Sequence, residues 1–199
     1  MVFKKIIGLM IGCLGLAKHP TRPVTCAEID QIVCNSPRIR LSDERFLAYR
    51  ERGVPKNKSN YRVIIVHGFG SSKEMDFMAP KELLDELSIY LLQFDRVGYG
   101  ESDPNPKRSL SSESSDIEEL ADKLQLGSKF YLVEVSVGCY PVWSCLRQIP
   151  NRLAGVSLVV PNINFKWLSL PDDLTKDVYM RGLSRRIFWF GRYSPGLLH

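Results

Sequence analysis

Ser136 is the residue whose type and surroundings point most directly to chemistry. It lies in the run Glu134-Val135-Ser136-Val137-Gly138, between a segment that predicts a strand (130–135) and one that predicts a helix (138–148). A serine on such a turn projects its hydroxyl above the sheet, and free N–H groups at the helix start can stabilise a negatively charged oxygen. The run therefore predicts a serine nucleophile, although a chance x-S-x-G at a strand end remains the simpler interpretation of this motif alone.

Two glycine-containing segments follow the two preceding predicted strands. After strand 61–66, the run His67-Gly68-Phe69-Gly70 lets the backbone N–H of Phe69 point toward the same place as that of Val137. His67 is expected to orient this loop rather than to act as a base. After strand 89–95, the segment 95–103 combines turn glycines with polar groups that hold a sharp loop. The residues expected to support the site are His67, Gly68, Gly70, Asp95, Gly98, Gly100, Ser102 and Gly138.

Alternating strands and helices are predicted to position these loops. The sequence predicts a hairpin over 38–50, strands at 61–66, 89–95, 130–135 and 153–160, and helices at 80–87, 110–126 and 138–148. Because the strands after the hairpin are apolar throughout, they predict a mostly parallel sheet with helices on both faces. In the serine-rich segment 109–116, Ser115 or Asp116 is expected to cap the following helix.

Charge and cysteine spacing exclude several classes of protein. The 199 residues carry a net charge of +5, and residues 1–60 contain 11 Lys/Arg against 5 Asp/Glu, so the rest is nearly neutral. No basic stripe crosses the predicted domain, which argues against a nucleic-acid partner. Five cysteines without a C-x-x-C pair and three histidines offer no metal-ligand spacing, so neither a metal nor a cofactor is predicted.

The N-terminus predicts targeting to a membrane or to the secretory pathway. Lys4 and Lys5 precede 12 apolar residues, Ile6 to Ala17, which is short of the roughly 20 that a spanning helix needs but suits a signal anchor. The alternative is an ordinary amphipathic first helix in a cytoplasmic protein. The predicted organisation is a targeting or anchor segment (1–18), a linker (19–37), a core (38–162) and a further region (163–199).

The three motifs, in this order and spacing, resemble those of the α/β-hydrolase superfamily over roughly residues 38–198, and the run 95–107 is similar to its plant single-domain members. The resemblance implies the α/β-hydrolase fold, with Ser136 as nucleophile and the N–H groups of Phe69 and Val137 as the oxyanion hole. It also implies a small-molecule ester substrate, and a helical cap that begins within 163–199.

Two departures from the family pattern bear on activity. Glu134 stands where the family has glycine, so it must either push the turn open or bury a carboxylate. The family places an acid and then a histidine after the serine, whereas the only later histidine is His199, the last residue, which we do not expect to serve as base. Asp172, Asp173 and Asp177 are interpreted as surface or capping charges.

We therefore predict a serine esterase-like hydrolase of ester or acyl substrates that is shortened at its C-terminal side and inactive or weakly active as this chain. The last predicted strand, 153–160, would leave an exposed apolar edge at which the chain could associate with itself. The alternative is a non-catalytic protein of the same fold that binds a ligand or a partner. Whether this chain is an enzyme is left open by the sequence.

Overall fold

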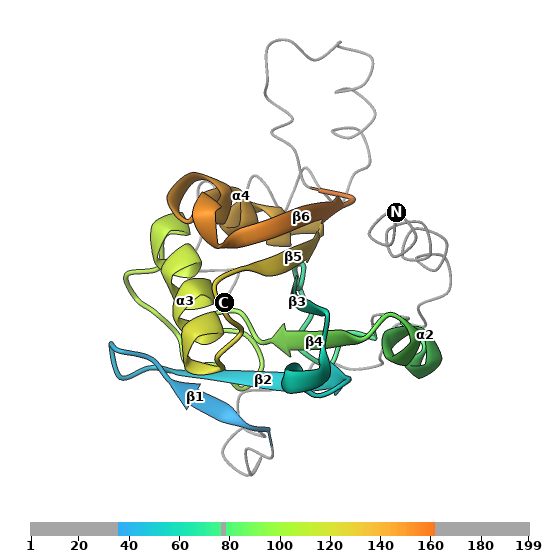
Figure 1. Cartoon of the computed structure of the whole chain (residues 1–199). Helices are drawn as coiled ribbons and strands as arrows, with labels where there is room; N and C mark the ends of the chain where they lie inside the picture. The colour runs from blue at the N-terminus through green and yellow to red at the C-terminus, as the bar shows by residue number, and fades with distance from the viewer. Residues whose placement is uncertain (1–35, 77–78, 162–199) are drawn as a thin grey trace, which may run out of the picture. The chain divides into compact units, whose positions relative to one another are not determined.

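The computed structural model describes residues 36–76 and 79–161, which form a mixed sheet flanked by helices (Figure 1). The predicted anchor 1–18, most of the linker and the region 163–199 lie outside the described residues. The strands are β1 (Arg38–Arg40), β2 (Phe46–Gly53), β3 (Tyr61–Val66), β4 (Ile89–Phe94), β5 (Phe130–Val135) and β6 (Leu153–Val159). The helices are α2 (Lys81–Glu86), α3 (Leu110–Lys123) and α4 (Cys139–Gln148), with 3-10 turns η2 (Lys56–Lys58), η3 (Ser136–Gly138) and η4 (Pro150–Arg152).

The strands form one sheet in the order β1-β2-β4-β3-β5-β6. β2 pairs antiparallel with both of its neighbours, β1 and β4. The four strands β4, β3, β5 and β6 run parallel to one another. The predicted mostly parallel sheet is confirmed. Because parallel strands end at the same edge, the loops after β3, β4 and β5, which contain the three motifs, gather at one edge of the sheet.

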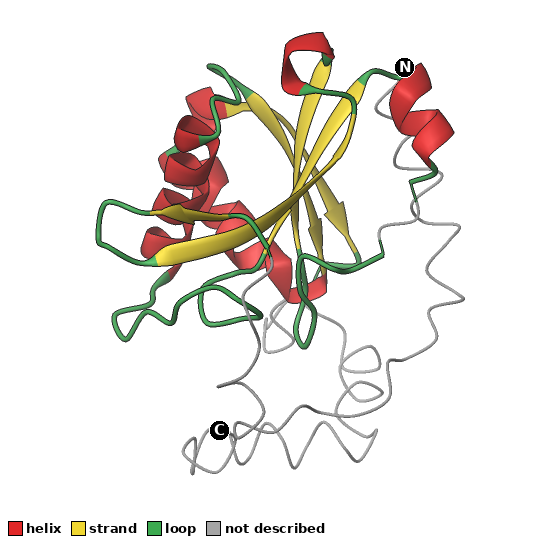
Figure 2. Cartoon of the chain, turned by 90° about the horizontal axis from the view of Figure 1, so that it is seen from below, coloured by secondary structure: helices red, strands yellow, loops and turns green. Residues whose placement is uncertain are grey.

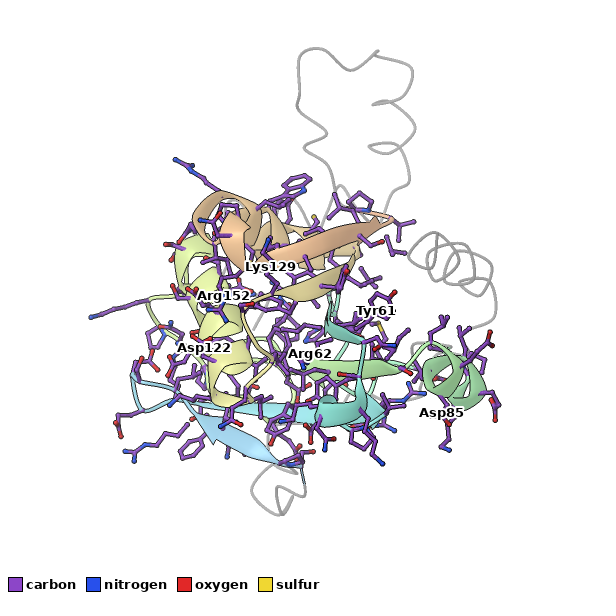
Figure 3. The ribbon with its side chains drawn as sticks, viewed as in Figure 1. Tyr61, Arg62, Asp85, Asp122, Lys129 and Arg152 are labelled. Carbon is purple, nitrogen blue, oxygen red and sulfur yellow. The ribbon has the colours of Figure 1, made fainter. Side chains whose placement is uncertain are left out.

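Helices cover both faces of the sheet (Figure 2). On one face α3 and α4 enclose a core that contains Ile64, Leu92 and Leu132. On the other face Leu84 of α2 packs with Ile65 and other side chains from β3, β4 and β5. Burial on both faces explains why these strands are apolar at nearly every position rather than at alternate ones.

The N-terminal cap of α3 differs from the prediction. Ser109 caps the helix in a reciprocal arrangement: its hydroxyl accepts from the Ser112 N–H at 3.0 Å, and the Ser112 hydroxyl accepts from the Ser109 N–H at 2.9 Å. The expectation of Ser115 or Asp116 was wrong. Asp116 lies inside the helix, where its carboxylate binds the Arg45 guanidinium at 2.6 and 3.1 Å.

Strand β6 is outermost on its side of the sheet within the described residues. It pairs with β5 from Phe130↔Leu153 to Val135↔Val159, with a shift in register near Phe130. Leu158 is 41% exposed, and Val160, just after the strand, is 64% exposed. No helix within 36–76 and 79–161 is long and apolar enough to cross a bilayer. In the same ranges no three His, Cys, Asp or Glu side chains gather as metal ligands would.

Candidate active site

Ser136 lies at the sharp turn between β5 and α4, in the left-handed region of backbone conformation with φ of 57°. For a residue with a Cβ this conformation costs about 1 kcal/mol or more, so the surrounding packing must hold it. Gly138 shows how: a Cβ at this position would lie 2.5 Å from the Val66 carbonyl oxygen and 2.9 Å from that of His67. The glycine lets the start of α4 pack directly against the end of β3, which closes the turn around the serine.

The loop after β3 runs alongside this turn. A Cβ built on Gly68 would lie 3.2 Å from the Ser136 Cβ and 3.8 Å from its Oγ, so the backbone of the loop passes next to the hydroxyl-bearing side chain. Gly70 adopts φ of 64°, and the side chain of Phe69 between the two glycines is 82% exposed. The structure thus brings the histidine-glycine motif and the serine motif together, although they are 64 or more residues apart in sequence.

His67 is buried and both of its ring nitrogens are occupied. Nδ1 lies 2.8 Å from the Gly68 carbonyl oxygen, and Nε2 accepts the Arg96 backbone N–H at 3.0 Å. This pattern needs a proton on Nδ1 and a lone pair on Nε2, which is the neutral imidazole. Burial lowers the pKa of His67 in the same direction. The ring ties the loop after β3 to the loop after β4 and has no free nitrogen for a reaction at Ser136.

Asp95, at the end of β4, is fully buried and saturated with hydrogen bonds. Its carboxylate accepts from the Lys73 backbone N–H at 2.7 Å, from Lys73 Nζ at 2.9 Å and from the Glu101 backbone N–H at 2.9 Å. Its carbonyl oxygen accepts the Ser102 hydroxyl at 2.7 Å, and that hydroxyl accepts from the Ala48 N–H at 2.9 Å. These groups hold the loop after β4 against β2, so these contacts of the carboxylate serve the loop.

Two glycines make the Asp95 loop possible. Gly98 and Gly100 adopt φ of 76° and 52°, and a Cβ on Gly100 would overlap the Asp95 carboxylate. Without side chains at these positions, the backbone can fold directly over the buried acid.

Sequence reasoning missed the charged partners of these loops. Lys73 bridges Asp95 and Glu101 while only 4% exposed. Arg96 donates from Nε and Nη2 to one oxygen of the buried Glu113, at 3.1 and 3.0 Å, and Arg108 donates to the other at 2.8 Å. No spacing rule connects residues 22 or 17 positions apart. The one available signal was that a charged residue inside an apolar region needs a partner.

Glu134, which precedes the serine turn at the end of β5, has no hydrogen-bond partner for its carboxyl group. Its side chain is 0% exposed, and neither carboxylate oxygen makes a hydrogen bond. Burial raises the pKa of Glu134 to about 7, with an opposing contribution from the backbone N–H of Val159, which does not reach hydrogen-bond geometry. Of the two outcomes that the sequence left open, the structure has the buried carboxylate and a closed turn.

No histidine is free to act as a base for Ser136 within residues 36–76 and 79–161. His67 is the one histidine of those ranges, and its ring nitrogens are bound as described. His199 and the acids Asp172, Asp173 and Asp177 lie outside them. The site as described therefore consists of a strained serine, two adjacent backbone segments and the loops that support them.

Comparisons with known proteins agree with this arrangement. No family model matches the chain. The abhydrolase domain-containing protein abhd-5.2 of Caenorhabditis elegans is 31% identical over 117 residues, which cover 56% of this chain and 26% of that protein. Among solved structures, a thermophilic esterase from Thermogutta terrifontis matches with a TM-score of 0.56 and 23% identity, over 82% of this chain and 56% of the esterase. The enol-lactonase from Burkholderia xenovorans LB400 matches with a TM-score of 0.52 and 18% identity, over 60% and 45% of the two chains.

The sheet order, the strained serine turn and these similarities define an α/β-hydrolase fold. The chain's three motifs resemble those of this fold, and its sequence is similar to that of an abhydrolase domain-containing protein over 117 residues. It spans about a quarter of the curated relative and about half of these two solved structures.

Proposed function

We propose that this chain contains the nucleophile and oxyanion-binding half of a serine hydrolase for small-molecule esters or related acyl compounds. The observation that supports this most directly is Ser136 at φ of 57° with the Gly68 backbone packed against its side chain. A structural serine needs neither the strained conformation nor the close glycine loop. The solved structures of similar fold include an esterase and a lactonase, and both of these names refer to ester bonds.

In the proposed reaction, Ser136 Oγ attacks the carbonyl carbon of the ester, and the electron pair of the C=O bond moves to the oxygen. The backbone N–H groups of Phe69 and Val137 stabilise this oxyanion. Collapse of the intermediate breaks the bond to the alcohol, which leaves with a proton, and water then hydrolyses the acyl-serine. The serine proton needs an acceptor, and the described residues supply none. Oxyanion-hole N–H donors and substrate binding, without a base, give an acceleration of about 10³–10⁴ over the reaction in water. The activity of this chain is therefore expected to be marginal.

The alternative function is ligand or partner binding without catalysis. The buried Glu134 carboxyl favours it, because a negative charge two residues from Ser136 would oppose an oxyanion. So does the engagement of both His67 nitrogens by backbone groups.

A fluorophosphonate probe separates the two functions. The full chain is expected to be labelled slowly, and Ser136→Ala should abolish the labelling. Ser128→Ala, an exposed serine outside the site, is the matched control and should label like the unmodified chain. Hydrolysis of short p-nitrophenyl esters by the same three proteins should follow the same order. Labelling of the unmodified chain no faster than that of Ser136→Ala would favour the binding function.

Membrane attachment through residues 1–18 is proposed on the charge and length of that segment, Lys4 and Lys5 before 12 apolar residues. Residues 1–36 fused to a fluorescent protein should localise to membranes or to the secretory route. A diffuse cytosolic signal would contradict this.

Self-association through β6 is proposed because β6 pairs on one side only within the described residues, and carries the exposed Leu158. Light scattering of the full chain is expected to give the mass of a dimer or a larger species. A proline at Ser157 or Leu158, which interrupts the edge, should reduce that mass, and a monomeric full chain would contradict the proposal.

A further inference from the structure

Glu134 is the next-to-last residue of β5, which lies between β3 and β6 in the sheet. Its parallel neighbours in register are Val66 on β3 and Leu158 on β6, both apolar. Because side chains alternate along a strand, Glu134 points to the same face as Leu132, into the core that α3 and α4 cover. The carboxyl group is therefore enclosed by apolar side chains on its own strand and on both adjacent strands.

No charged group compensates this carboxyl. The charged and titratable groups on the elements packed against its face are Glu113, Asp116, Glu118, Glu119, Asp122 and Lys123 on α3, Cys139, Tyr140, Cys145 and Arg147 on α4, Tyr90 on β4, and His67 and Arg96 in the loops after β3 and β4. None of them affects the pKa of Glu134, which burial dominates. Glu113 and Asp116 are instead committed to arginine partners. Ionisation of Glu134 would thus place an unpaired charge in a nonpolar environment, which proteins avoid by keeping such a group protonated or by admitting water.

We propose that the Glu134 carboxyl is a proton-binding switch in the serine turn. The protonated carboxyl keeps the turn closed. The ionised carboxyl draws water between β5, the end of β6 and the start of α4, and this opens the turn. The opening should occur on the β6 side, because the backbone N–H of Val159, the last residue of β6, is the group that favours the charge. The switch does not depend on whether Ser136 reacts, because it concerns the backbone that holds the serine.

The direction of the effect follows from proton linkage. A carboxyl whose pKa is higher in the closed state than in the open state binds more protons when closed, so closure is favoured at low pH and weakens as pH rises. The weakening begins near the ordinary value of 4.5 and is complete above the raised value of about 7. At pH 8 to 9 the ratio of open to closed turn should exceed that at pH 4 by up to about a hundredfold.

Amide hydrogen exchange of the full chain tests the switch. At pH 8.5, amides of residues 135–142 should exchange up to about a hundredfold faster in the unmodified chain than in Glu134→Gln, which has the same shape and cannot ionise. At pH 4.5 the two proteins should exchange alike. Glu82→Gln, which removes an exposed charge on α2, is the matched control and should behave like the unmodified chain. Equal exchange of the unmodified chain and Glu134→Gln at pH 8.5 would overturn the proposal.

A second measurement does not depend on the folding of any variant. In the full chain labelled with ¹³C at glutamate carboxyl carbons, one resonance should titrate near pH 7. If ionisation of this carboxyl opens the turn, its resonance should broaden by exchange, or its chemical shift should change over the same pH range as the amide shifts of residues 135–142. The proposal fails if every glutamate carboxyl titrates below about pH 5, or if one titrates near pH 7 without any change in those amides.

Discussion

Two buried acids lie at the ends of β4 and β5, two strands of the same sheet that β3 separates, and they have opposite surroundings. Asp95, after β4, is 0% exposed and accepts three hydrogen bonds, one of them from the ammonium of Lys73. Glu134, at the end of β5, is also 0% exposed and accepts none. Burial is the same in the two sites, so the difference lies in whether the chain supplies donors. The loop after β4 supplies donors to Asp95, so that acid stabilises the fold. Glu134 stands where the family has glycine and receives no donor, so its burial destabilises the fold when it is ionised.

The largest expected effect is the loss of the Asp95 carboxylate. Asp95→Ala leaves Lys73 buried with Glu101 as its remaining partner and removes the acceptor for two backbone N–H groups, so we expect about 3–5 kcal/mol of destabilisation. Urea unfolding at pH 7 measures this. Asp85→Ala, which breaks an exposed ion pair with Lys81, is the control and should cost less than about 1 kcal/mol. Similar losses in the two variants would show that the Asp95 loop contributes no more than a surface pair.

The opposite sign is expected for Glu134. Its pKa rises from 4.5 to about 7 on folding, so the folded state is favoured below pH 4.5 and loses stability as the pH rises to 7. Glu134→Gln should therefore stabilise the chain by at most about 3 kcal/mol at pH 8 and have little effect at pH 4. Thermal unfolding at the two pH values tests this, with Glu82→Gln as the exposed control. A gain of the same size at both pH values would contradict a role for ionisation.

The two acids also illustrate which features of this structure could be predicted from the sequence and which could not. The strands around Ile64, Leu92 and Leu132 were predictable because a doubly covered strand must be apolar throughout. The serine turn was predictable because its motif is local, lying between a strand and a helix that are both recognisable. Glu134 was recognisable as a departure from the family pattern, which has glycine at this position. Whether its carboxyl would be buried or exposed depends on how three strands and two helices pack around it, which the sequence does not show.

Long-range polar pairing was not predictable at all. The Lys73 contact with Asp95 joins positions that no periodicity relates, and the sequence alone did not single out Ser109 among the serines of 109–116 as the cap. The contact of His67 Nε2 with the Arg96 N–H depends on where the loop after β4 passes. Sequence patterns record which residues are buried, whereas hydrogen-bond partners are decided by how the loops pack against one another.

A smaller effect concerns a single member of the Asp95 network. The Ser102 hydroxyl donates to the Asp95 carbonyl and accepts from the Ala48 N–H, so it connects the loop after β4 to β2. Ser102→Ala should cost about 1–3 kcal/mol, because it leaves a buried N–H and a buried carbonyl unsatisfied. Urea unfolding provides the measurement. Ser128→Ala, at an exposed position, should have almost no effect, and equal stabilities of the two variants would remove Ser102 from the network.

The smallest expected effect comes from giving Glu134 a partner. Leu158 lies directly opposite on β6 and is 41% exposed, so a lysine there can pack its stem along the strand while its ammonium approaches the carboxyl. Relative to Leu158→Met, which keeps the length without the charge, Leu158→Lys should lower the pKa of Glu134 and recover about 0.5–1 kcal/mol at pH 8. At pH 4, where the carboxyl is protonated in both variants, the recovery should vanish. Because the same two proteins are compared at both pH values, the cost of replacing Leu158 cancels and only the charge pairing remains. Unchanged dependence of the melting temperature on pH would mean that the carboxyl stays out of reach of its neighbour, and that its missing partner cannot be supplied from β6.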